Sequence, residues 1–361
     1  MKKELSALEI RQLVNEFQFL VDARIEKIYQ VSKKEFIFKI HHTGGDIFLK
    51  IQGKFIYLSS EKGDTPETPS SLCTILRKNL ENRKIRKIWQ KGSERIVIFE
   101  TESTILIAEL FGQQNLILCD SDYKVIAASR VQKEGRIISR GEKYNFPEEK
   151  INAFKISENE FSAIISSGIE LVKSVAGLIG GVYAEEVCLR AKIDKNSKKI
   201  SRDESKKLYD AFVSLLKQEP SPMIVFEKEA PIDAVVFELE HYAGKSKVLF
   251  SNFYEAVESY LFQSLAKEKE SEAEKKYNLQ IEKINSIIKM QEKRISELRE
   301  EAERNQRAGE LIYEKYQEIS DIMKELQEAK NKMSWEEMKS KIKNKKITFV
   351  DEKDALITVD L

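Results

Sequence analysis

A run of basic residues between Leu76 and Arg95 is the part of the sequence best suited to bind an anionic partner. It holds eight cations and two acidic residues, so its net charge is +6 (eight minus two) in a chain whose formal net charge is +1. The cations are Arg77, Lys78, Arg83, Lys84, Arg86, Lys87, Lys91 and Arg95, and Trp89 lies among them. Because lysine and arginine contacts to phosphate usually supply nucleic-acid affinity, the run predicts an RNA- or DNA-binding surface. A solvated helix and loop without a ligand is the alternative.

A turn that contains Gly180 and Gly181 is the second candidate site. Residues 171–191 have the pattern of a helix-hairpin-helix, in which an apolar helix, this turn and a second helix follow one another. Glycines in such a turn leave backbone N–H groups free to face a phosphate. Glu185 and Glu186, near the start of the second helix, favour its dipole but would repel a phosphate. The turn therefore predicts either a nucleic-acid contact or a purely structural hairpin.

Signatures of catalysis and of metal binding are missing from the sequence. The histidines are His41, His42 and His241, and no Cys, Asp or Glu is expected to join the His41–His42 pair as a metal ligand. The sequence contains no nucleophile elbow, no Walker loop and no dinucleotide fingerprint. These features predict no metal site, no cofactor and no enzyme activity, and they favour a binding protein.

Length and composition restrict the class of protein further. A chain of 361 residues exceeds a single compact core, so two to three domains are expected. Three widely spaced cysteines, Cys73, Cys119 and Cys188, favour a reducing compartment and argue against a disulfide framework. The near-neutral net charge excludes a uniformly basic nucleic-acid binder. Charged residues interrupt the N-terminal segment and no other window could span a bilayer, so we expect a cytoplasmic protein without a membrane partner.

The basic run lies in a predicted α+β domain that covers residues 1–148. An amphipathic helix is predicted from Leu8 to about residues 22–24, because apolar residues recur there at three- and four-residue spacing. A second helix is predicted after Thr68 as the N-cap, with Pro69 at its first position. Apolar runs predict strands at 35–40, 46–51, 55–58, 95–100, 104–110, 115–119 and 125–128. The basic run therefore connects the second helix to the strand at 95–100.

Three further segments are predicted after this domain. Residues 149–254 would form the helix-hairpin-helix domain with a strand pair at 223–226 and 234–239, and residues 334–361 would begin a hairpin with strands at 346–350 and 355–359. Residues 255–333 contain no proline and one glycine, and a heptad seam there predicts a coiled-coil arm. An unpaired seam also predicts self-association through the arm, most simply as an antiparallel dimer. Its apolar positions are Tyr277, Ile281, Ile284, Ile288, Ile295, Leu298, Ala302, Ile312, Tyr316, Ile319, Met323 and Leu326, and Gln291, Asn305 and Gly309 weaken it.

Six stretches of the sequence carry a family resemblance. They are DARIEKIYQ (22–30), TILRKNLENRKI (74–85), GSERIV (92–97), ELFGQQNLILCDSDYKVIA (109–127), GGVYAEEVCLRA (180–191) and AGELIYEKYQEI (308–319), with AKNKMSW continuing the last. In this order and spacing, across essentially the entire chain, they resemble the NFACT family, the ribosome quality-control factors of the NEMF/RqcH type that older labels call fibronectin-binding-protein-A-like. The sequences of these stretches resemble those of archaeal or eukaryotic members of the family. Because the family continues with a returning helix and an RNA-binding domain, the resemblance implies its N-terminal portion or a shortened paralogue.

The resemblance implies both a function and a fold. Family members bind the large ribosomal subunit that still carries a stalled peptidyl-tRNA, recruit a charged tRNA (alanyl in most members) and promote untemplated C-terminal tails, while the ribosome makes the peptide bond. Their first domain is similar to the N-terminal domain of formamidopyrimidine-DNA glycosylases, and a helix-hairpin-helix domain and a coiled-coil arm follow it. This chain starts Met1-Lys2, without an N-terminal proline nucleophile, and has no four-cysteine zinc finger, so glycosylase chemistry is not expected.

The resemblance also assigns site residues. An Asp-Arg pair in the family's first domain is associated with tRNA recruitment, and the matching positions here are Glu94 and Arg95. The basic run adds expected contacts to tRNA and ribosomal RNA, namely Arg77, Lys78, Arg83, Lys84, Arg86 and Lys87. One alternative is a DNA-binding repair-like module without glycosylase activity, which a preference for duplex DNA over tRNA would favour. The other is an adhesin for extracellular matrix, against which the missing signal peptide argues.

Overall fold

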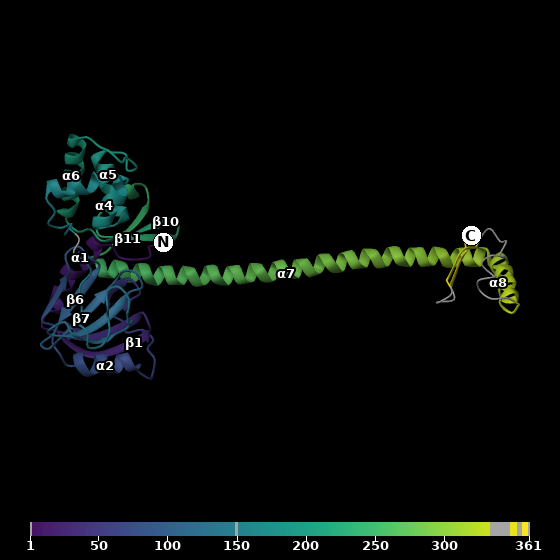
Figure 1. Cartoon of the computed structure of the whole chain (residues 1–361), viewed down its shortest axis with the longest axis horizontal. Helices are drawn as coiled ribbons and strands as arrows, with labels where there is room; N and C mark the ends of the chain where they lie inside the picture. Colours follow the sequence, from purple (N-terminus) through teal and green to yellow (C-terminus); the bar gives the residue numbers. More distant parts are fainter. Residues whose placement is uncertain (1, 149–150, 333–346, 352–355, 360–361) are drawn as a thin grey trace. The chain divides into compact units, whose positions relative to one another are not determined.

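The computed structural model describes residues 2–148, 151–332, 347–351 and 356–359, which fall into two compact units, Met1–Glu270 and Ser271–Leu361 (Figure 1). The first unit holds two larger antiparallel sheets, a helical region and a small third sheet. This confirms the predicted mixture of helix and sheet, whereas the division into four segments stays a prediction. No helix in the described part of the chain has the length and the apolar run that crossing a membrane requires.

The N-terminal helix α1, Ala7–Glu16, begins with a capping box. The Ser6 side chain accepts a hydrogen bond from the backbone N–H of Glu9, and the Glu9 carboxylate accepts one from the N–H of Ser6. A 3-10 turn, η1 (Phe17–Leu20), follows α1. The helix predicted from Leu8 is therefore confirmed, but it ends before residues 22–24, since Asp22 has a left-handed φ of 67° that an α-helix cannot contain.

The first sheet has the strand order β1-β2-β3-β4, with bounds Arg24–Ser32, Glu35–His42, Gly45–Gln52 and Phe55–Ser59. The three strands predicted here are confirmed. Strand β1 was not predicted, because charged residues interrupt its apolar alternation. Helix α2, Ser71–Leu80, packs beside β1, and its N-cap is Ser70, whose side chain accepts a hydrogen bond from the N–H of Cys73. The prediction that Thr68 caps α2 is therefore wrong, and Pro69 precedes the cap.

The second sheet has the order β5-β6-β7-β8-β9, with bounds Lys87–Gln90, Ile96–Glu100, Thr104–Glu109, Asn115–Asp120 and Val125–Ala128. The last four strands are as predicted. Strand β5 was not predicted, and it belongs to the basic run. Its pairing with β6 places Trp89 opposite Ile98, where the indole ring partly covers a small apolar cluster on one face of the sheet.

The helical region of the first unit consists of α3 (Glu158–Ile165), α4 (Leu171–Ile179), α5 (Gly181–Ala191) and α6 (Arg202–Leu216). One hydrophobic core extends from α1 and both larger sheets into α4, α5 and α6. The third sheet has the order β11-β10-β12, with β10 at Met223–Glu227, β11 at Ala230–Val235 and β12 at Ser246–Leu249. The strand predicted at 234–239 thus begins and ends earlier. Pro231 is tolerated because β11 is an edge strand, where a missing N–H removes no necessary ladder bond.

Helix α7, Phe253–Glu314, starts in the first unit, where Phe253, Ala256, Val257 and Tyr260 are buried, and continues into the second. Helix α8, Tyr316–Lys330, follows after Lys315, whose φ of −107° and ψ of 23° interrupt the helix. The predicted seam therefore runs over two helices instead of one. The hairpin expected near the C-terminus is confirmed as β13 (Ile347–Asp351) paired antiparallel with β14 (Leu356–Val359).

Candidate nucleic-acid interface

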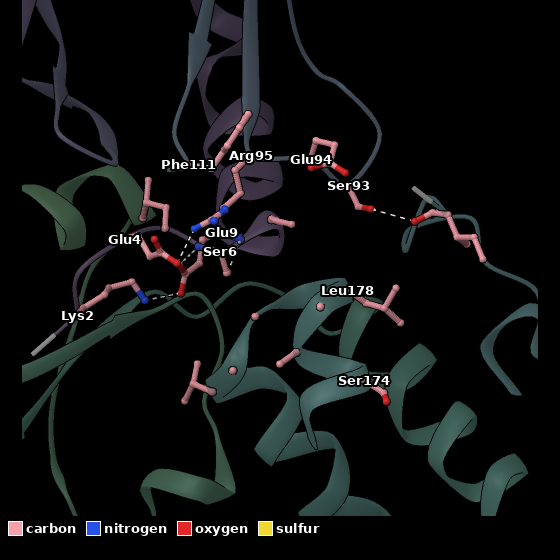
Figure 2. A pocket seen from close by; sticks show the side chains of 18 of the residues that line it. Lys2, Glu4, Ser6, Glu9, Ser93, Glu94, Arg95, Phe111, Ser174 and Leu178 are labelled. Atoms are coloured by element: carbon pink, nitrogen blue, oxygen red, sulfur yellow. Dashed lines mark hydrogen bonds and ion pairs between the residues drawn. The ribbon is translucent and has the colours of Figure 1, made fainter. Parts of the chain in front are cut away.

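A cavity of about 960 Å³ lies in the first unit, where the N-terminal segment, the turn between β5 and β6, and the turn between α4 and α5 meet (Figure 2). Glu94 and Arg95 line one wall, and Gly180 and Gly181 line another. The two sites predicted separately from the sequence, which lie more than eighty residues apart in the chain, are therefore walls of one cavity.

Arg95 is held in a defined orientation at this cavity. The turn before it is tied to α1, because the Gln90 side-chain amide donates hydrogen bonds to the carbonyls of Ala7 and Glu94 at 2.9 Å each. The guanidinium of Arg95 lies 2.6 Å from the Glu4 carboxylate, whose other oxygen is 2.5 Å from the Lys54 ammonium. Partial burial opposes ionisation of Glu4, but hydrogen bonds and attraction from Lys54 and Arg95 keep the pKa of Glu4 below its ordinary value.

Glu94 differs from Arg95 in its surroundings. Within the described residues the Glu94 carboxylate forms no hydrogen bond and no ion pair, although its backbone is held by Lys91 and Gln90. The Arg95 side chain is 28% exposed, and one Nη atom contacts Glu4. The pair therefore offers an acceptor and further guanidinium donors to a ligand at the cavity wall.

At Gly180 the turn between α4 and α5 approaches the N-terminal segment closely. The φ of Gly180 is 105°, and a Cβ atom at this position would lie 2.5 Å from the Cβ of Ser6. Only glycine fits both the backbone angle and the space. Gly180 is the N-cap of α5, and the first two residues of that helix, Gly181 and Val182, also line the cavity.

A buried network of charges forms another part of the cavity lining. The Lys2 ammonium lies 2.6 Å from the Glu9 carboxylate and 2.8 Å from the Asp233 carboxylate. The hydroxyls of Tyr183 and Tyr242 donate to Glu9 and Asp233, at 3.0 and 2.7 Å. Burial alone would lower the pKa of Lys2, but attraction to the two carboxylates more than offsets it, so the pKa of Lys2 is raised. The network joins α1, α5 and β11 around one ammonium that stays protonated.

This network was missed from the sequence. Its members are far apart in the chain, and Lys2 looks like an ordinary N-terminal lysine. The spacing of Ser6 and Glu9 is the one available signal, because it has the form of a capping box. That signal predicts the contact of Glu9 with the Ser6 backbone but not its contact with Lys2.

The other predicted cations do not line the cavity. The Nε of Arg77 donates to the carbonyl of Ile28, and Arg86 pairs with Asp22 and Glu102 at 2.5 and 2.8 Å. Lys87 lies 3.9 Å from Glu100 and stacks over the Trp89 ring. Part of the predicted positive charge is thus neutralised within the chain. Lys78, Arg83 and Lys84 are exposed and form no ion pair with any described residue.

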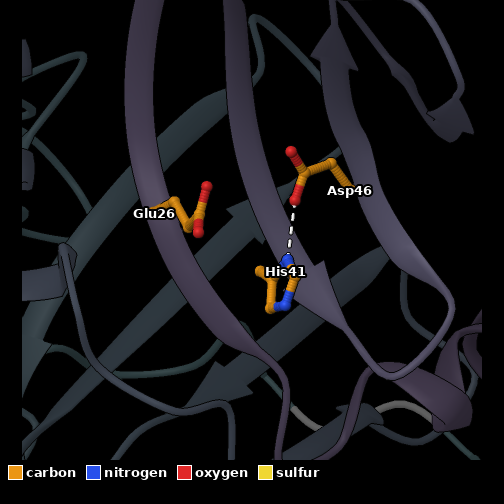
Figure 3. Close-up of side chains that lie close together, drawn as sticks. All are labelled: Glu26, His41 and Asp46. Carbon is orange, nitrogen blue, oxygen red and sulfur yellow. Dashed lines mark hydrogen bonds and ion pairs between the residues drawn. The ribbon is translucent and has the colours of Figure 1, made fainter.

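The expectation that no Asp or Glu joins His41 as a possible metal ligand is wrong. Glu26, His41 and Asp46 come together on three neighbouring strands, with the Nδ1 atom of His41 2.8 Å from Asp46 (Figure 3). Asp46 lies opposite His41 in the pairing of β2 with β3, a register that the sequence pattern did not predict. The Lys39 ammonium lies 2.7 Å from Glu26 and 2.6 Å from Asp46, so a cation of the chain itself already balances both carboxylates.

Comparison with known proteins gives consistent matches. The model of the family described as NFACT N-terminal and middle domains matches residues 6–355. The archaeal Rqc2 homolog aRqcH of Methanocaldococcus jannaschii is 33% identical over 96% of this chain and 55% of its own length. The ribosome quality control complex subunit NEMF of Homo sapiens is 21% identical over 94% of this chain and 35% of its own length.

A solved structure agrees with the fold. The fibrinogen binding protein from Staphylococcus aureus matches with a TM-score of 0.58 and 20% identity, over 70% of this chain and 97% of that one. At this level of identity the match concerns the fold alone. The chain spans about half the length of the archaeal relative and about a third of the human one.

Proposed function

The chain belongs to the NFACT family, and on that premise we propose that it is a ribosome quality-control factor that binds the large ribosomal subunit with a stalled peptidyl-tRNA. It acts in the cytoplasm, contacts ribosomal RNA and recruits a charged tRNA, most simply alanyl-tRNA, for untemplated C-terminal tailing. The observation that carries the proposal is the single cavity that Glu94 and Arg95 share with Gly180 and Gly181. Sequencing the RNA that co-purifies with the chain tests it.

The chemistry of the cavity favours binding over catalysis. A tRNA loop or backbone presents phosphates and base edges, and the wall offers it an arginine fork, a carboxylate acceptor and helix N–H groups. Among the described residues that line the cavity, Lys2 carries an amine. Because Glu9 and Asp233 keep its ammonium protonated, it has no free electron pair for attack. We therefore propose a binding and positioning factor, with the peptide bond made by the ribosome.

The basic run is expected to bind phosphates outside the cavity. Changing Arg83, Lys84, Arg86 and Lys87 to glutamate should weaken binding to tRNA and ribosomal RNA. The slope of log affinity against log salt concentration should become flatter by about one unit for each phosphate that is no longer bound. Filter-binding titrations at several salt concentrations measure both quantities. Since Arg86 is already paired and Arg83 and Lys84 are not, Arg83→Glu with Lys84→Glu should account for most of the change in slope. An unchanged affinity and slope in the fourfold variant would assign the run to a solvated surface.

The arm is expected to bring two copies together. Ile284, Ile288 and Leu298 are 57%, 44% and 47% exposed within the second unit, and each unburied methylene costs about 0.8 kcal/mol. Light scattering coupled to size exclusion should therefore give a dimer at micromolar concentration. Ile284→Asp with Ile288→Asp should shift it toward the monomer, whereas Lys283→Asp with Lys289→Asp should not. A wild-type chain that stays monomeric with full helix content would contradict the expectation.

A further inference from the structure

We propose that the connection between α5 and α6 is a second RNA-binding surface, which holds the phosphate backbone of duplex RNA. This α5–α6 basic surface consists of Lys192, Lys195, Lys198, Lys199, Arg202, Lys206 and Lys207. The inference deepens the proposed function, because a large ribosomal subunit would supply such a duplex. It assigns that contact to the helical region and leaves tRNA capture to the cavity at Arg95.

Charge is the first observation. Residues 192–207 hold seven cations against Asp194, Asp203 and Glu204, so their net charge is +4 (seven minus three) in a chain that is close to neutral. All seven cationic residues are exposed. Arg202 is also the first residue of α6, where a cation works against the helix dipole. Helix stability therefore does not account for the cation at Arg202.

Two of the acidic residues accept hydrogen bonds from Ser201 and Asn196, and Glu204 also attracts a cation of the surface, Lys207. The Glu204 carboxylate accepts hydrogen bonds from the N–H and the hydroxyl of Ser201, and the backbone hydrogen bond lowers the pKa of Glu204. The Asp194 carboxylate accepts from the N–H of Asn196. Lys195 pairs with Glu185 at 3.1 Å. The other six cations form no ion pair with any residue in the described part of the chain.

The backbone that carries these cations is fixed. The carbonyls of Ser197 and Lys195 accept hydrogen bonds from the first N–H groups of α4, those of Leu171 and Val172, at 3.0 and 3.1 Å. Ser201 then caps α6 with a capping box. A connection fastened at both points displays its lysines with little backbone entropy left to lose on binding. This distinguishes it from a disordered basic tail.

The type of RNA follows from what the surface lacks. Residues 192–207 contain no aromatic side chain on which an unpaired base could stack, and stacking is how most single-strand sites hold their bases. Duplex RNA is recognised mainly through its backbone and shape, which lysines and arginines can contact. Helix α2 of the basic run and α6 lie at opposite ends of the first unit (Figure 1). Arg77 and Lys78 on α2 are therefore placed to contact another stretch of RNA than the α5–α6 basic surface.

The test measures binding of the full chain to a mixed-sequence RNA duplex of about 20 base pairs, longer than the ~16 that a double-strand-binding domain spans. The variant carries Lys198→Glu, Lys199→Glu and Lys206→Glu. The control carries Lys33→Glu, Lys34→Glu and Lys133→Glu, which change the net charge equally at exposed residues in other turns. In filter binding between about 50 and 200 mM salt, the variant should bind the duplex on the order of a hundredfold more weakly than wild type. The slope of its log affinity against log salt concentration should be flatter by about two to three units. The control should stay within about threefold of wild type. Circular dichroism verifies that both are folded.

Three results would overturn the inference: a variant that binds the duplex like wild type, a control that loses as much affinity, or a polyglutamate peptide that wild type binds more tightly than the duplex at the same salt. Co-sedimentation separates the inference from the proposed function. If wild type and variant sediment equally with large subunits, the inference fails and the function stands. If the variant alone loses duplex affinity and wild type fails to sediment with large subunits, the inference stands and the function fails.

Discussion

Replacing Arg95 with alanine is expected to weaken capture of charged tRNA by about tenfold to a hundredfold, while association with the large subunit stays within about twofold. A guanidinium that makes paired hydrogen bonds to a base edge contributes about 1–3 kcal/mol, which corresponds to about fivefold to 160-fold and includes this range. Arg95 lies at the cavity wall with donors left over after its contact with Glu4. Adding Glu94→Ala should deepen the loss only slightly. Fluorescence anisotropy with charged tRNA, alongside subunit co-sedimentation, measures the two activities separately.

Lys54→Ala is the matched control for a purely structural role of Arg95. Lys54 and Arg95 contact the two oxygens of the same Glu4 carboxylate, so either change removes one cation from Glu4. If the role of Arg95 is to neutralise Glu4, both variants should lose tRNA binding equally. Recruitment by Arg95 requires that Lys54→Ala binds tRNA nearly as wild type does. Equal loss of tRNA and subunit binding in Arg95→Ala would show that the residue holds the domain together instead.

Changing Lys2 to methionine is expected to lower the free energy of unfolding by about 3–5 kcal/mol. The variant leaves the Glu9 and Asp233 carboxylates buried without their shared cation, and an uncompensated buried charge is destabilising by about this amount. Because the network lies at the cavity, tRNA capture should fall together with stability. Urea unfolding followed by circular dichroism measures the loss. Lys3→Met is the control, because it removes the same charge from an exposed position and should cost little.

The stability defect of Lys2→Met should also depend on pH. Without the ammonium, the burial that already raises the pKa of Glu9 acts unopposed, so a proton on one of the two carboxyls relieves the repulsion. A raised carboxyl pKa gives stability that is present at low pH and lost as the pH rises through that value. The difference between variant and wild type should therefore shrink from pH 8 to pH 5. A constant difference over this range would mean that poorer packing, not charge, causes the defect.

The sequence predicted the elements whose apolar residues follow one clear period. Strands β2, β3, β4 and β6 to β9 agree with it, because their inward side chains are consistently apolar. Strand β1 was missed since Glu26 and Lys27 interrupt its pattern, and β5 was hidden within the basic run. The interruption of the long helix at Lys315 could not be predicted, because neither proline nor glycine lies there.

The candidate site was predictable as two separate pieces but not as one cavity. Charge and glycine content indicated the basic run and the Gly180–Gly181 turn. That Arg95 shares a cavity with Gly180 depends on tertiary packing between segments far apart in the chain. The same holds for Lys2, Glu9 and Asp233, and for Asp46 beside His41, which became visible only through strand pairing. Patterns in a single sequence indicate which residues are neighbours in the chain and which face of a helix or strand is buried. They do not indicate which helices and strands contact one another.

The proposed function is tested most directly by gradient sedimentation of the chain with three ribosomal samples: large subunits that carry peptidyl-tRNA, vacant large subunits and small subunits. Sequencing of the bound RNA identifies any recruited tRNA. We expect co-sedimentation to be strongest with the subunits that carry peptidyl-tRNA, retention on small subunits to be weak, and the bound fraction to hold a charged tRNA that Arg95→Ala loses. Equal retention on all three samples, or displacement of the bound RNA by duplex DNA at the same concentration, would contradict the proposed function.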